Sequence, residues 1–355
     1  MARRVQLARE VAKVKMVAKL PLYRGDKEKE RLEEVGKWAD TEGIDPLFAR
    51  SLLYSVIGES CKQQMILKDS CNGEVTVHVD KESWHKRLRA NLIELTKMWA
   101  PTYDKEYGKE FVSTRLHQAY EEEILGQMVE SLPHHEAIVD LGCATGRVAL
   151  QFGPRFRQRF GYDVSPDMIE VALRHAAERH NRNVYFEVHD IEMGIPLAND
   201  SVSLVVMNQG TGSDIQNISG LLAEIERVLK PEGQFFVSFY NAQALAYRTF
   251  LPWPLTLAAE INVNENYLEV HCKGKIIPVY AEAYSVDKVE NLFTGRLLSV
   301  TQVSTHPTVG AILPNDVYTE QAVASFVERL DRSLALGDAY FGAYIVVCGV
   351  KNRSV

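Results

Sequence analysis

The sequence predicts an α/β protein in which an all-helical domain precedes a doubly wound, mostly parallel sheet. Segments typical of strands and of helices alternate after residue 136, a pattern typical of parallel sheets with helices on both faces. The first 67 residues instead show helical periodicity and no strand pattern. A chain of 355 residues is also long enough to form two compact units.

We expect three parts along the chain. Residues 1–67 form the helical domain, whose third helix starts at Asp45-Pro46, with the aspartate as cap and proline in the first turn. Residues 68–92 form a linker, and residues 93–355 form the sheet domain. An insertion at about residues 242–285 interrupts the alternation after the fifth strand, and we expect a helix and two strands that cap a substrate cleft.

Within the sheet domain, five segments are typical of buried parallel strands: "AIVDLG", "RFGYDV", "VYFEVHD", "SLVVMN" and "QFFVSFY". The segments "RVALQF", "SPDMIEVALRHAAERH" and "SGLLAEIERVLK" have helical periodicity and lie between these strands. The tail "DAYFGAYIVVCGVK" predicts a last strand, which we expect at the antiparallel edge of the sheet.

The composition is that of an ordinary soluble globular protein, with 46% hydrophobic and 25% charged residues. A net charge of −7 argues against non-specific nucleic-acid binding. The basic N-terminus lacks the apolar stretch of a secretory signal, and no apolar run approaches the roughly 18 residues needed to span a bilayer. Five scattered cysteines without metal-ligand spacing predict free thiols, no metal site and a cytoplasmic protein.

The stretch "VDLGCATGRVAL" (residues 139–150) predicts a strand, a glycine turn and the start of a helix. A dinucleotide fingerprint needs G-x-G-x-x-G, but the register from Gly142 places Ala144 and Arg147 at the second and third glycines. Arg147 would obstruct the close helix–strand approach that the third glycine permits. Asp140 would repel a pyrophosphate, whereas its carboxylate suits a ligand that carries ammonium and sulfonium charges.

Two further acids follow the next two predicted strands. Asp163 ends the second strand, where a carboxylate can accept hydrogen bonds from two ribose hydroxyls. Asp190 ends the third strand, where it can accept a hydrogen bond from an adenine amino group, with Met168 and Ile191 on the two sides of the ring. Together with Asp140, these acids favour S-adenosylmethionine over a dinucleotide.

Four segments resemble, in order, those of the class I S-adenosylmethionine-dependent methyltransferases: "VDLGCATGR", "GYDVSPDMIEVA", "VHDIEMGIPLANDSVSLVV" and "LLAEIERVLKPEGQFFVSFYN". The resemblance covers roughly Ile93–Lys351 and is closest to the small-molecule branch that includes quinone-biosynthesis C-methyltransferases. It implies a Rossmann-like fold, S-adenosylmethionine as cofactor and a small-molecule substrate. Ser203 stands where the family has an acid before the fourth strand, so we expect a charge to be missing beside the site.

In the family, the first segment holds the methionine part of the cofactor, and acids equivalent to Asp163 and Asp190 hold the ribose and the adenine. The resemblance and the strand ends together give the cofactor-binding candidates Asp140, Gly142, Cys143, Ala144, Gly146, Asp163, Val164, Met168, Asp190, Ile191, Asn208 and Gln209. Ala144 replaces the usual middle glycine of the family.

Methyl transfer from a sulfonium is an SN2 displacement in which the protein mainly aligns two reactants in a dry cleft. Candidate catalytic residues are therefore those expected around the cleft: Asn208, Tyr103, Tyr240 and Tyr247. Tyr103 lies in "MWAPTYDKEYGKEF", a segment that resembling proteins place as a lid over the cofactor. For each tyrosine, ordinary packing in the core is the alternative.

Weaker candidates come from histidines and from the insertion. His189 adjoins Asp190, where a solvated neighbour is the alternative, and His306 lies in a predicted loop. Trp253, Tyr267 and Tyr280 of the insertion indicate an aromatic pocket or, alternatively, packing within an added hairpin.

Residues 4–64 resemble the all-helical, AroQ-type chorismate mutases through "RRVQLAREVAKVK", "LPLYRGDKEKE" and "GIDPLFARSLLYSVIGESCKQQ". The resemblance places six residues at active-site positions of that family: Arg4, Lys15, Lys27, Glu28, Ser60 and Gln64. Lys27 replaces an arginine that grips substrate, and Arg24 replaces an aspartate. We therefore expect a degenerate module that forms a homodimer through the N-terminal helices.

The sequence leaves four functional readings open. The chain is a methyltransferase acting on a small molecule, or an enzyme that cyclises or cleaves S-adenosylmethionine with release of methylthioadenosine. The third hypothesis is a bifunctional chorismate mutase–methyltransferase of aromatic metabolism. The fourth is a scaffold that binds the nucleoside without reaction.

Overall fold

The computed structural model describes residues 33–35, 37–42, 81–105, 111–180, 183–248, 259–262, 266–272, 275–337 and 340–353. The chain divides into two compact units. One consists of Met1–Asp80 with Arg248–Leu255, and within it the structure describes helical residues at 33–35 and 37–41. The other consists of Lys81–Tyr247 with Thr256–Val355 and starts inside the segment expected as a linker.

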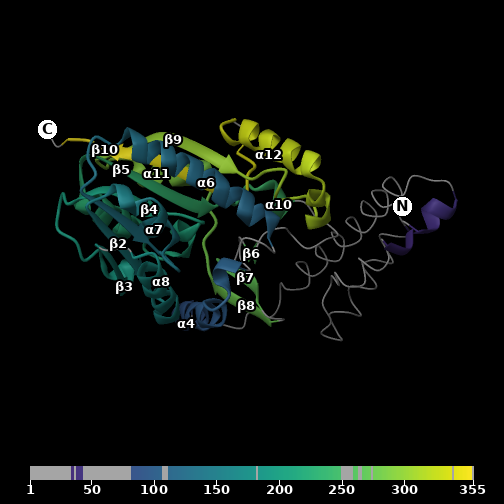
Figure 1. Ribbon diagram of the computed structural model, residues 1–355, viewed down its shortest axis with the longest axis horizontal. Coiled ribbons are helices and arrows are strands. Elements are labelled where there is room, and N and C mark those ends of the chain that lie inside the picture. The colour runs from purple at the N-terminus through teal and green to yellow at the C-terminus, as the bar shows by residue number, and fades with distance from the viewer. Residues whose placement is uncertain are drawn as a thin grey trace. The chain divides into compact units, whose positions relative to one another are not determined.

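The larger unit contains a seven-stranded sheet in the order β3-β2-β1-β4-β5-β10-β9. Figure 1 labels these strands except β1. Its strands are β1 (Ala137–Leu141), β2 (Gln158–Asp163), β3 (Val184–Val188), β4 (Val202–Met207), β5 (Leu229–Tyr240), β9 (Leu298–His306) and β10 (Tyr344–Lys351). The pairs from β3 to β5 are all parallel. The predicted doubly wound α/β class is thereby confirmed, and the strand order reverses between β1 and β4, where such sheets bind ligands.

The prediction that the last strand lies at the edge is wrong. β10 pairs antiparallel with β5 on one side and with β9 on the other, so β9 is the edge strand. The physical reason is visible in "YIVVCGVK", a nearly continuous apolar run that is buried along almost its whole length. Such a run is typical of a strand covered on both faces and bonded on both sides.

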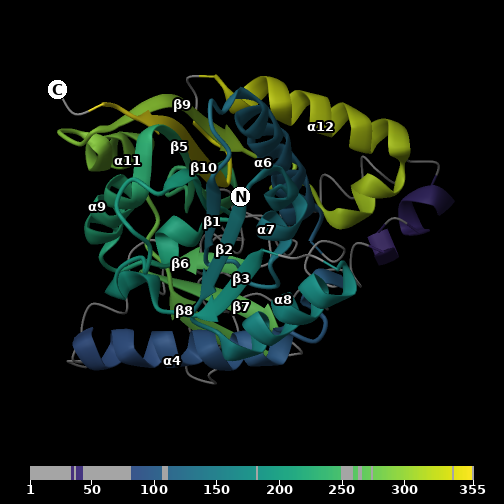
Figure 2. The ribbon, with the colours of Figure 1, turned by 60° about the vertical axis from the view of Figure 1, so that its left-hand side comes forward.

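Helices cover both faces of the sheet (Figure 2). On one face, α9 (Ile218–Val228) and α11 (Val286–Phe293) pack on a core that includes Val139, Leu141 and Val205. On the other face, α6 (Val112–Ser131) and α7 (Arg147–Gln151) pack on Ile138, Leu204 and Val206, and α12 (Gln321–Ala335) joins them through Ala335. Neighbouring residues of each strand thus face opposite cores, as the two-residue period of a strand requires.

The remaining helices lie close to the ends of the strands. α8 (Pro166–Glu178) follows β2 and packs with α7 against Phe186 of β3. Short 3-10 helices follow β3 at Ile191–Met193 (η3) and β4 at Thr211–Asp214 (η4). Two others lie at Gly153–Arg155 (η2) and Asn315–Thr319 (η5).

The insertion after β5 forms α10 (Leu245–Arg248) and, in its described part, three strands rather than the two expected. β6 (Ala259–Asn262), β7 (Tyr267–Cys272) and β8 (Lys275–Tyr280) make a separate antiparallel sheet. α4 (Lys81–Trp99) packs against this sheet, and Asn91 Nδ2 donates a hydrogen bond to the carbonyl of Pro278 at 2.8 Å (Figure 1).

Over the described part of the chain, we find no helix with the length and apolar character needed to cross a bilayer. Cys143 and Cys348 are buried free thiols, and Cys272 is buried as well, whereas Cys61 and Cys71 lie outside the described residues.

Candidate functional site

A cavity of about 710 Å³ lies at the carboxyl ends of β1, β2 and β4, which is within the size range of small-molecule sites. Residues of α4, α6, β7, β8 and β10 contribute to its other walls. All four catalytic candidates line it: Tyr103, Asn208, Tyr240 and Tyr247. Of the cofactor-binding candidates, these line it: Asp140, Gly142, Cys143, Ala144, Asp163, Val164, Met168, Asp190, Ile191, Asn208 and Gln209.

The glycine loop after β1 turns sharply at the floor of the cavity. The N–H groups of Gly142 and Cys143 both donate to the Tyr162 carbonyl, at 2.8 and 3.0 Å. Gly142 has a φ of 73°, and a Cβ there would lie 2.7 Å from Thr211 Cγ2, so both backbone conformation and space require glycine. Ala144 adopts a φ of 45°, a left-handed conformation that the middle glycine of the family would adopt without strain.

Gly146 is the one cofactor-binding candidate that does not line the cavity. A Cβ on Gly146 would lie 2.5 Å from Phe186 Cζ and 3.1 Å from Ala172 Cβ, and its φ is 82°. The glycine is therefore needed because the start of α7 packs closely against β3 and α8.

Asp140 is a buried carboxylate whose Oδ1 has no hydrogen-bond partner among the described residues. Burial raises the pKa of Asp140 to about 7; nearby Asp163 acts in the same direction, and Arg147 opposes it. Arg147 itself forms an ion pair with Glu122 of α6. An unsatisfied buried carboxylate oxygen is costly alone and is satisfied by a cation, so this position fits the ammonium of S-adenosylmethionine.

Asp163 ties β2 to the glycine loop. Its Oδ2 accepts the Ala144 N–H at 2.9 Å, and its Oδ1 accepts the Ser165 N–H at 2.8 Å. Burial raises the pKa of Asp163, whereas these two hydrogen bonds lower it. Each carboxylate oxygen keeps a second lone pair, so both remain able to accept a ribose hydroxyl.

Asp190 at the end of β3 is engaged by a residue that sequence reasoning missed. Its Oδ1 accepts the Glu192 N–H at 3.1 Å, and its Oδ2 forms an ion pair with Arg89 of α4. Arg89 also donates to Glu192 Oε1 at 3.1 Å. Met168 and Ile191, the residues expected beside an adenine ring, are both buried and line this part of the cavity.

The turn after β4 carries Asn208 and Gln209 and is held from α6. Glu121, fully buried in that helix, accepts hydrogen bonds from the Gln209 N–H and from Gln209 Nε2. Asn208 is 7% exposed, and its carbonyl accepts the Thr211 N–H at 3.1 Å. Nothing in the sequence around Glu121 marks it as part of the site, because α6 belongs to none of the four motifs.

Several aromatic side chains line the cavity. Burial raises the pKa of Tyr103, whose ring meets Trp99 edge-on at 5.9 Å, so its phenol stays neutral at physiological pH. Tyr280 of β8 lines the cavity, which agrees with the pocket alternative rather than with packing alone, and so does Tyr344 of β10, which was not anticipated. Tyr267 is not among the lining residues, and Trp253 lies outside the described residues.

The two histidine candidates differ in position. His189 lines the cavity, and its Nε2 is 2.8 Å from the Gly194 carbonyl. His306 ends strand β9 rather than lying in a loop; it is buried, its ring stacks on Tyr120 at 4.4 Å, and it is not among the lining residues.

The expectation that Ser203 leaves a charge missing beside the site is wrong. Ser203 Oγ accepts the Glu136 N–H at 3.1 Å and donates to Glu136 Oε2 at 2.9 Å. Glu136 precedes β1, so this contact lies at the amino ends of the strands, whereas the cavity lies at their carboxyl ends. Lys230 pairs with Glu136 Oε1 at 3.1 Å and completes that cluster.

The six mutase-like candidates, Arg4, Lys15, Lys27, Glu28, Ser60 and Gln64, all lie outside the described residues. Their predicted roles therefore stay predictions.

Comparison with known families agrees with both resemblances that the sequence shows. Residues 133–294 match the family model described as methyltransferase domain, and residues 1–65 match chorismate mutase type II. The range matched by the methyltransferase model contains Asp140, Asp163, Asp190 and Asn208, the residues at the strand ends that line the cavity.

Relatives of the methyltransferase domain are distant. The chain is 29% identical over 119 residues to the uncharacterized methyltransferase YcgJ of Bacillus subtilis, covering 33% of this chain and 46% of that protein. It is 28% identical over 136 residues to a demethylmenaquinone methyltransferase of Leptospira interrogans, covering 37% and 54%. The chain thus spans about half the length of these curated relatives. A crystal structure of YcgJ aligns with a TM-score of 0.42 at 18% identity, covering 66% of this chain and 100% of that one.

Proposed function

We propose that this chain transfers a methyl group from S-adenosylmethionine to a small-molecule acceptor. The observation that carries the proposal is Asp140, whose buried carboxylate has an oxygen without a partner at the floor of the cavity in a methyltransferase domain. A dinucleotide phosphate would meet three acids there, Asp140, Asp163 and Asp190, and like charges repel.

Different acids of the cavity would bind different parts of S-adenosylmethionine. Asp140 would bind the ammonium, Asp163 the ribose hydroxyls and Asp190 the adenine amino group. When bound, S-adenosylmethionine supplies a methyl group that is already activated by the positive sulfur. The chain then contributes alignment of the acceptor and exclusion of water, for which the aromatic wall of Tyr103, Tyr240 and Tyr247 is suited.

The relatives support an acceptor of small size. One is named a demethylmenaquinone methyltransferase, and another, from Hahella chejuensis, is named a malonyl-[acyl-carrier protein] O-methyltransferase and is 34% identical over 110 residues. The predominance of apolar and aromatic side chains in the cavity favours an acceptor with an apolar body.

The test is to incubate the protein with S-adenosylmethionine, with and without candidate acceptors, and to identify the nucleoside product by mass spectrometry. S-adenosylhomocysteine formed only with acceptor supports methyl transfer. Methylthioadenosine formed without acceptor supports the cyclase or lyase reading instead, and binding without any product supports the scaffold. One observation that favoured the lyase hypothesis no longer supports it. Ser203 lies at the amino ends of the strands, whereas the cavity lies at their carboxyl ends.

The match of residues 1–65 to chorismate mutase type II raises the question of whether the helical domain has mutase activity. Lys27 and Arg24 argue against efficient turnover, because each replaces a residue of different charge or geometry in that family. We therefore propose that the helical domain mainly forms a homodimer in a cytoplasmic protein. Light scattering on the full chain tests the dimer, and chorismate consumption above background would establish the mutase.

A further inference from the structure

The turn η4 carries an acid that the proposed cofactor contacts leave unused, and this turn is held rigidly. Ser213 Oγ accepts the Tyr240 N–H at 2.8 Å, and the Ser213 carbonyl accepts the Glu282 N–H at 2.8 Å. A Cβ on Gly212 would lie 2.6 Å from Phe239 Cε1, so the turn also packs tightly on β5. Asp214, the last residue of η4, is therefore presented from a fixed backbone.

The Asp214 side chain lines the cavity, and its carboxylate makes no hydrogen bond or ion pair with any residue that the structure describes. The Asp214 carboxylate interacts electrostatically with three ionisable groups, Asp163, Tyr103 and Tyr280. Burial, with Asp163 beside it, raises the pKa of Asp214 well above its ordinary value. A carboxylate of this kind is a stronger base than one in water.

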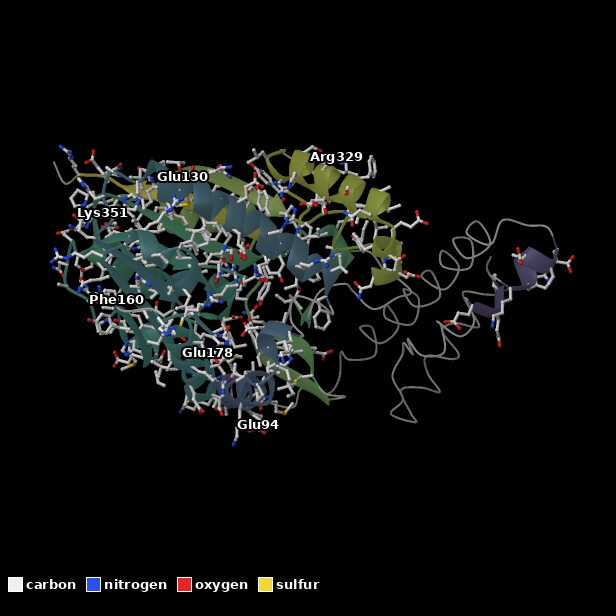
Figure 3. All side chains as sticks on the ribbon, in the orientation of Figure 1. Glu94, Glu130, Phe160, Glu178, Arg329 and Lys351 are labelled. Atoms are coloured by element: carbon white, nitrogen blue, oxygen red, sulfur yellow. The ribbon has the colours of Figure 1, made fainter. Side chains whose placement is uncertain are left out.

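The cavity that Asp214 lines also has apolar side chains along its walls. Ile215 follows it directly, and Leu268, Val270 and Val279 come from the added sheet. Helix α4 contributes a stripe with spacings of four, three and four residues: Leu88, Leu92, Leu95 and Trp99. Glu94, on the exposed side of the same helix, lies at the lower edge of the molecule (Figure 3).

We propose that Asp214 receives the nucleophile of the methyl acceptor, which is an apolar molecule that presents a neutral O–H or N–H group to this carboxylate. The proposal rests on the methyltransferase function proposed above. For a hydroxyl acceptor, the oxygen forms a bond to the methyl carbon while the methyl–sulfur bond breaks and its electron pair stays on sulfur. The hydroxyl proton passes to Asp214 and leaves to solvent after the product.

The same geometry disfavours an acceptor that presents a carboxylate at this position. Asp214 and Asp163 would both repel it, and the cationic side chains that line the cavity are engaged or exposed. Arg147 is paired with Glu122, and Arg89 is paired with Asp190, whereas Arg115 of α6 and Arg179, which follows α8, are solvent-exposed. A hydroxyl or amine instead supplies the donor that the Asp214 carboxylate lacks.

The experiment compares two probes that differ only in this group, 2-naphthol and 2-naphthoate. Each is titrated by calorimetry into the full chain, with and without saturating S-adenosylhomocysteine, in mildly alkaline buffer where naphthoate is charged and naphthol is neutral. The wild-type protein should bind naphthol about tenfold more tightly or better. Asp214→Asn should reduce this preference at least about tenfold, because its amide can donate to a carboxylate.

Asp214→Asn should leave the affinity for S-adenosylhomocysteine nearly unchanged and should not lower the melting temperature, because it removes a carboxylate whose pKa burial raises. The matched control is Asp287→Asn in the exposed first turn of α11, which should keep the preference of the wild type. Equal affinity of the wild type for both probes, no naphthol binding up to its solubility limit, or an unchanged preference in Asp214→Asn overturns the proposal. Absence of S-adenosylhomocysteine binding would instead refute the proposed function, since the probes are also titrated without it.

Discussion

Glu121 holds Gln209 by two hydrogen bonds, accepting the Gln209 backbone N–H at 2.9 Å and its side-chain Nε2 at 2.6 Å. A carboxylate only accepts, so it fixes which end of the Gln209 amide faces α6. Gln209 has a φ of 54°, and Gly210 after it has a φ of 81°. The two hydrogen bonds offset the strain of a left-handed non-glycine residue and so set the path of the chain at the end of β4.

His117 stabilises the buried Glu121 carboxylate. Its Nε2 lies 3.0 Å from Glu121 Oε1, one helical turn away. Burial alone would raise the pKa of Glu121, but His117, the Gln209 N–H and Arg147 together hold that pKa below its ordinary value. Because the folded-state pKa is lowered, Glu121 stabilises the fold above its ordinary pKa, and this contribution disappears as the pH falls through the folded-state value.

Glu121→Gln should weaken binding of S-adenosylhomocysteine about tenfold and lower the free energy of unfolding by about 1–3 kcal/mol. The amide that replaces the carboxylate keeps the shape but has one acceptor oxygen where two are used, so a buried donor of Gln209 loses its partner. Calorimetric titration and urea denaturation measure the two effects.

The control is Glu123→Gln, two residues along the same helix. Glu123 pairs with Arg332 at the surface, and such exposed pairs contribute about 0–1 kcal/mol. Equal affinities of Glu121→Gln and Glu123→Gln for S-adenosylhomocysteine would show that Glu121 does not position the site.

Asp140→Asn should stabilise the ligand-free protein above pH 7 while weakening cofactor binding. The pKa of Asp140 is raised from 3.8 to about 7, so the folded state binds the extra proton between these values, and stability falls as the pH rises through this window. Keeping the buried carboxylate ionised then costs up to about 4 kcal/mol, from a shift of roughly three pKa units at about 1.4 kcal/mol each. Thermal denaturation of both proteins across this pH range measures the difference.

The same substitution should weaken S-adenosylhomocysteine binding by about 1.5–3 kcal/mol, which is the usual contribution of a hydrogen bond to a charged group. Affinity of the wild type should rise with pH up to about 7, because the ammonium needs the ionised carboxylate. A flat pH profile of affinity in the wild type, with an unchanged Kd in Asp140→Asn, would remove Asp140 from the cofactor site.

Asp163→Ala should abolish measurable cofactor binding and also destabilise the fold. The substitution removes the ribose acceptor and leaves the N–H groups of Ala144 and Ser165 without their partner, at about 1–3 kcal/mol each if they stay buried. Asp163→Asn keeps one acceptor oxygen and should be intermediate in urea denaturation. Cofactor affinity of Asp163→Ala equal to that of the wild type would contradict the assignment.

The acids of the site could be predicted because parallel strands end at one edge of a sheet. Asp140, Asp163 and Asp190 each follow a strand that the apolar runs made visible, so their convergence followed from topology. Glu121 and Arg89 could not be found in this way, because they lie on helices whose placement depends on tertiary packing. Their sequence neighbourhoods, "AYEEEIL" and "WHKRLRAN", are typical of solvated helix faces.

Two errors have a common physical origin. The family resemblance placed Ser203 beside the site, and the antiparallel edge that such sheets often carry placed the last strand at the edge, but neither property follows from order along the chain. Ser203 belongs to the amino end of β4, where it meets Glu136. β10 is inserted between β5 and β9, and the continuous burial of "YIVVCGVK" was the available signal.

Gly146→Ala should destabilise the protein by about 2–4 kcal/mol, although Gly146 does not line the cavity. The added methyl would lie 2.5 Å from Phe186 Cζ, and its φ of 82° strains any residue with a Cβ. Gly295→Ala is the matched control, because Gly295 has a φ of 77° and nothing within 4 Å of the added carbon. Gly295→Ala should lower the free energy of unfolding by only about 1–2 kcal/mol, which is the cost of a left-handed backbone conformation in a residue with a Cβ. Urea denaturation of the two variants separates close packing from strain, and equal losses would mean that the α7–β3 contact does not require glycine.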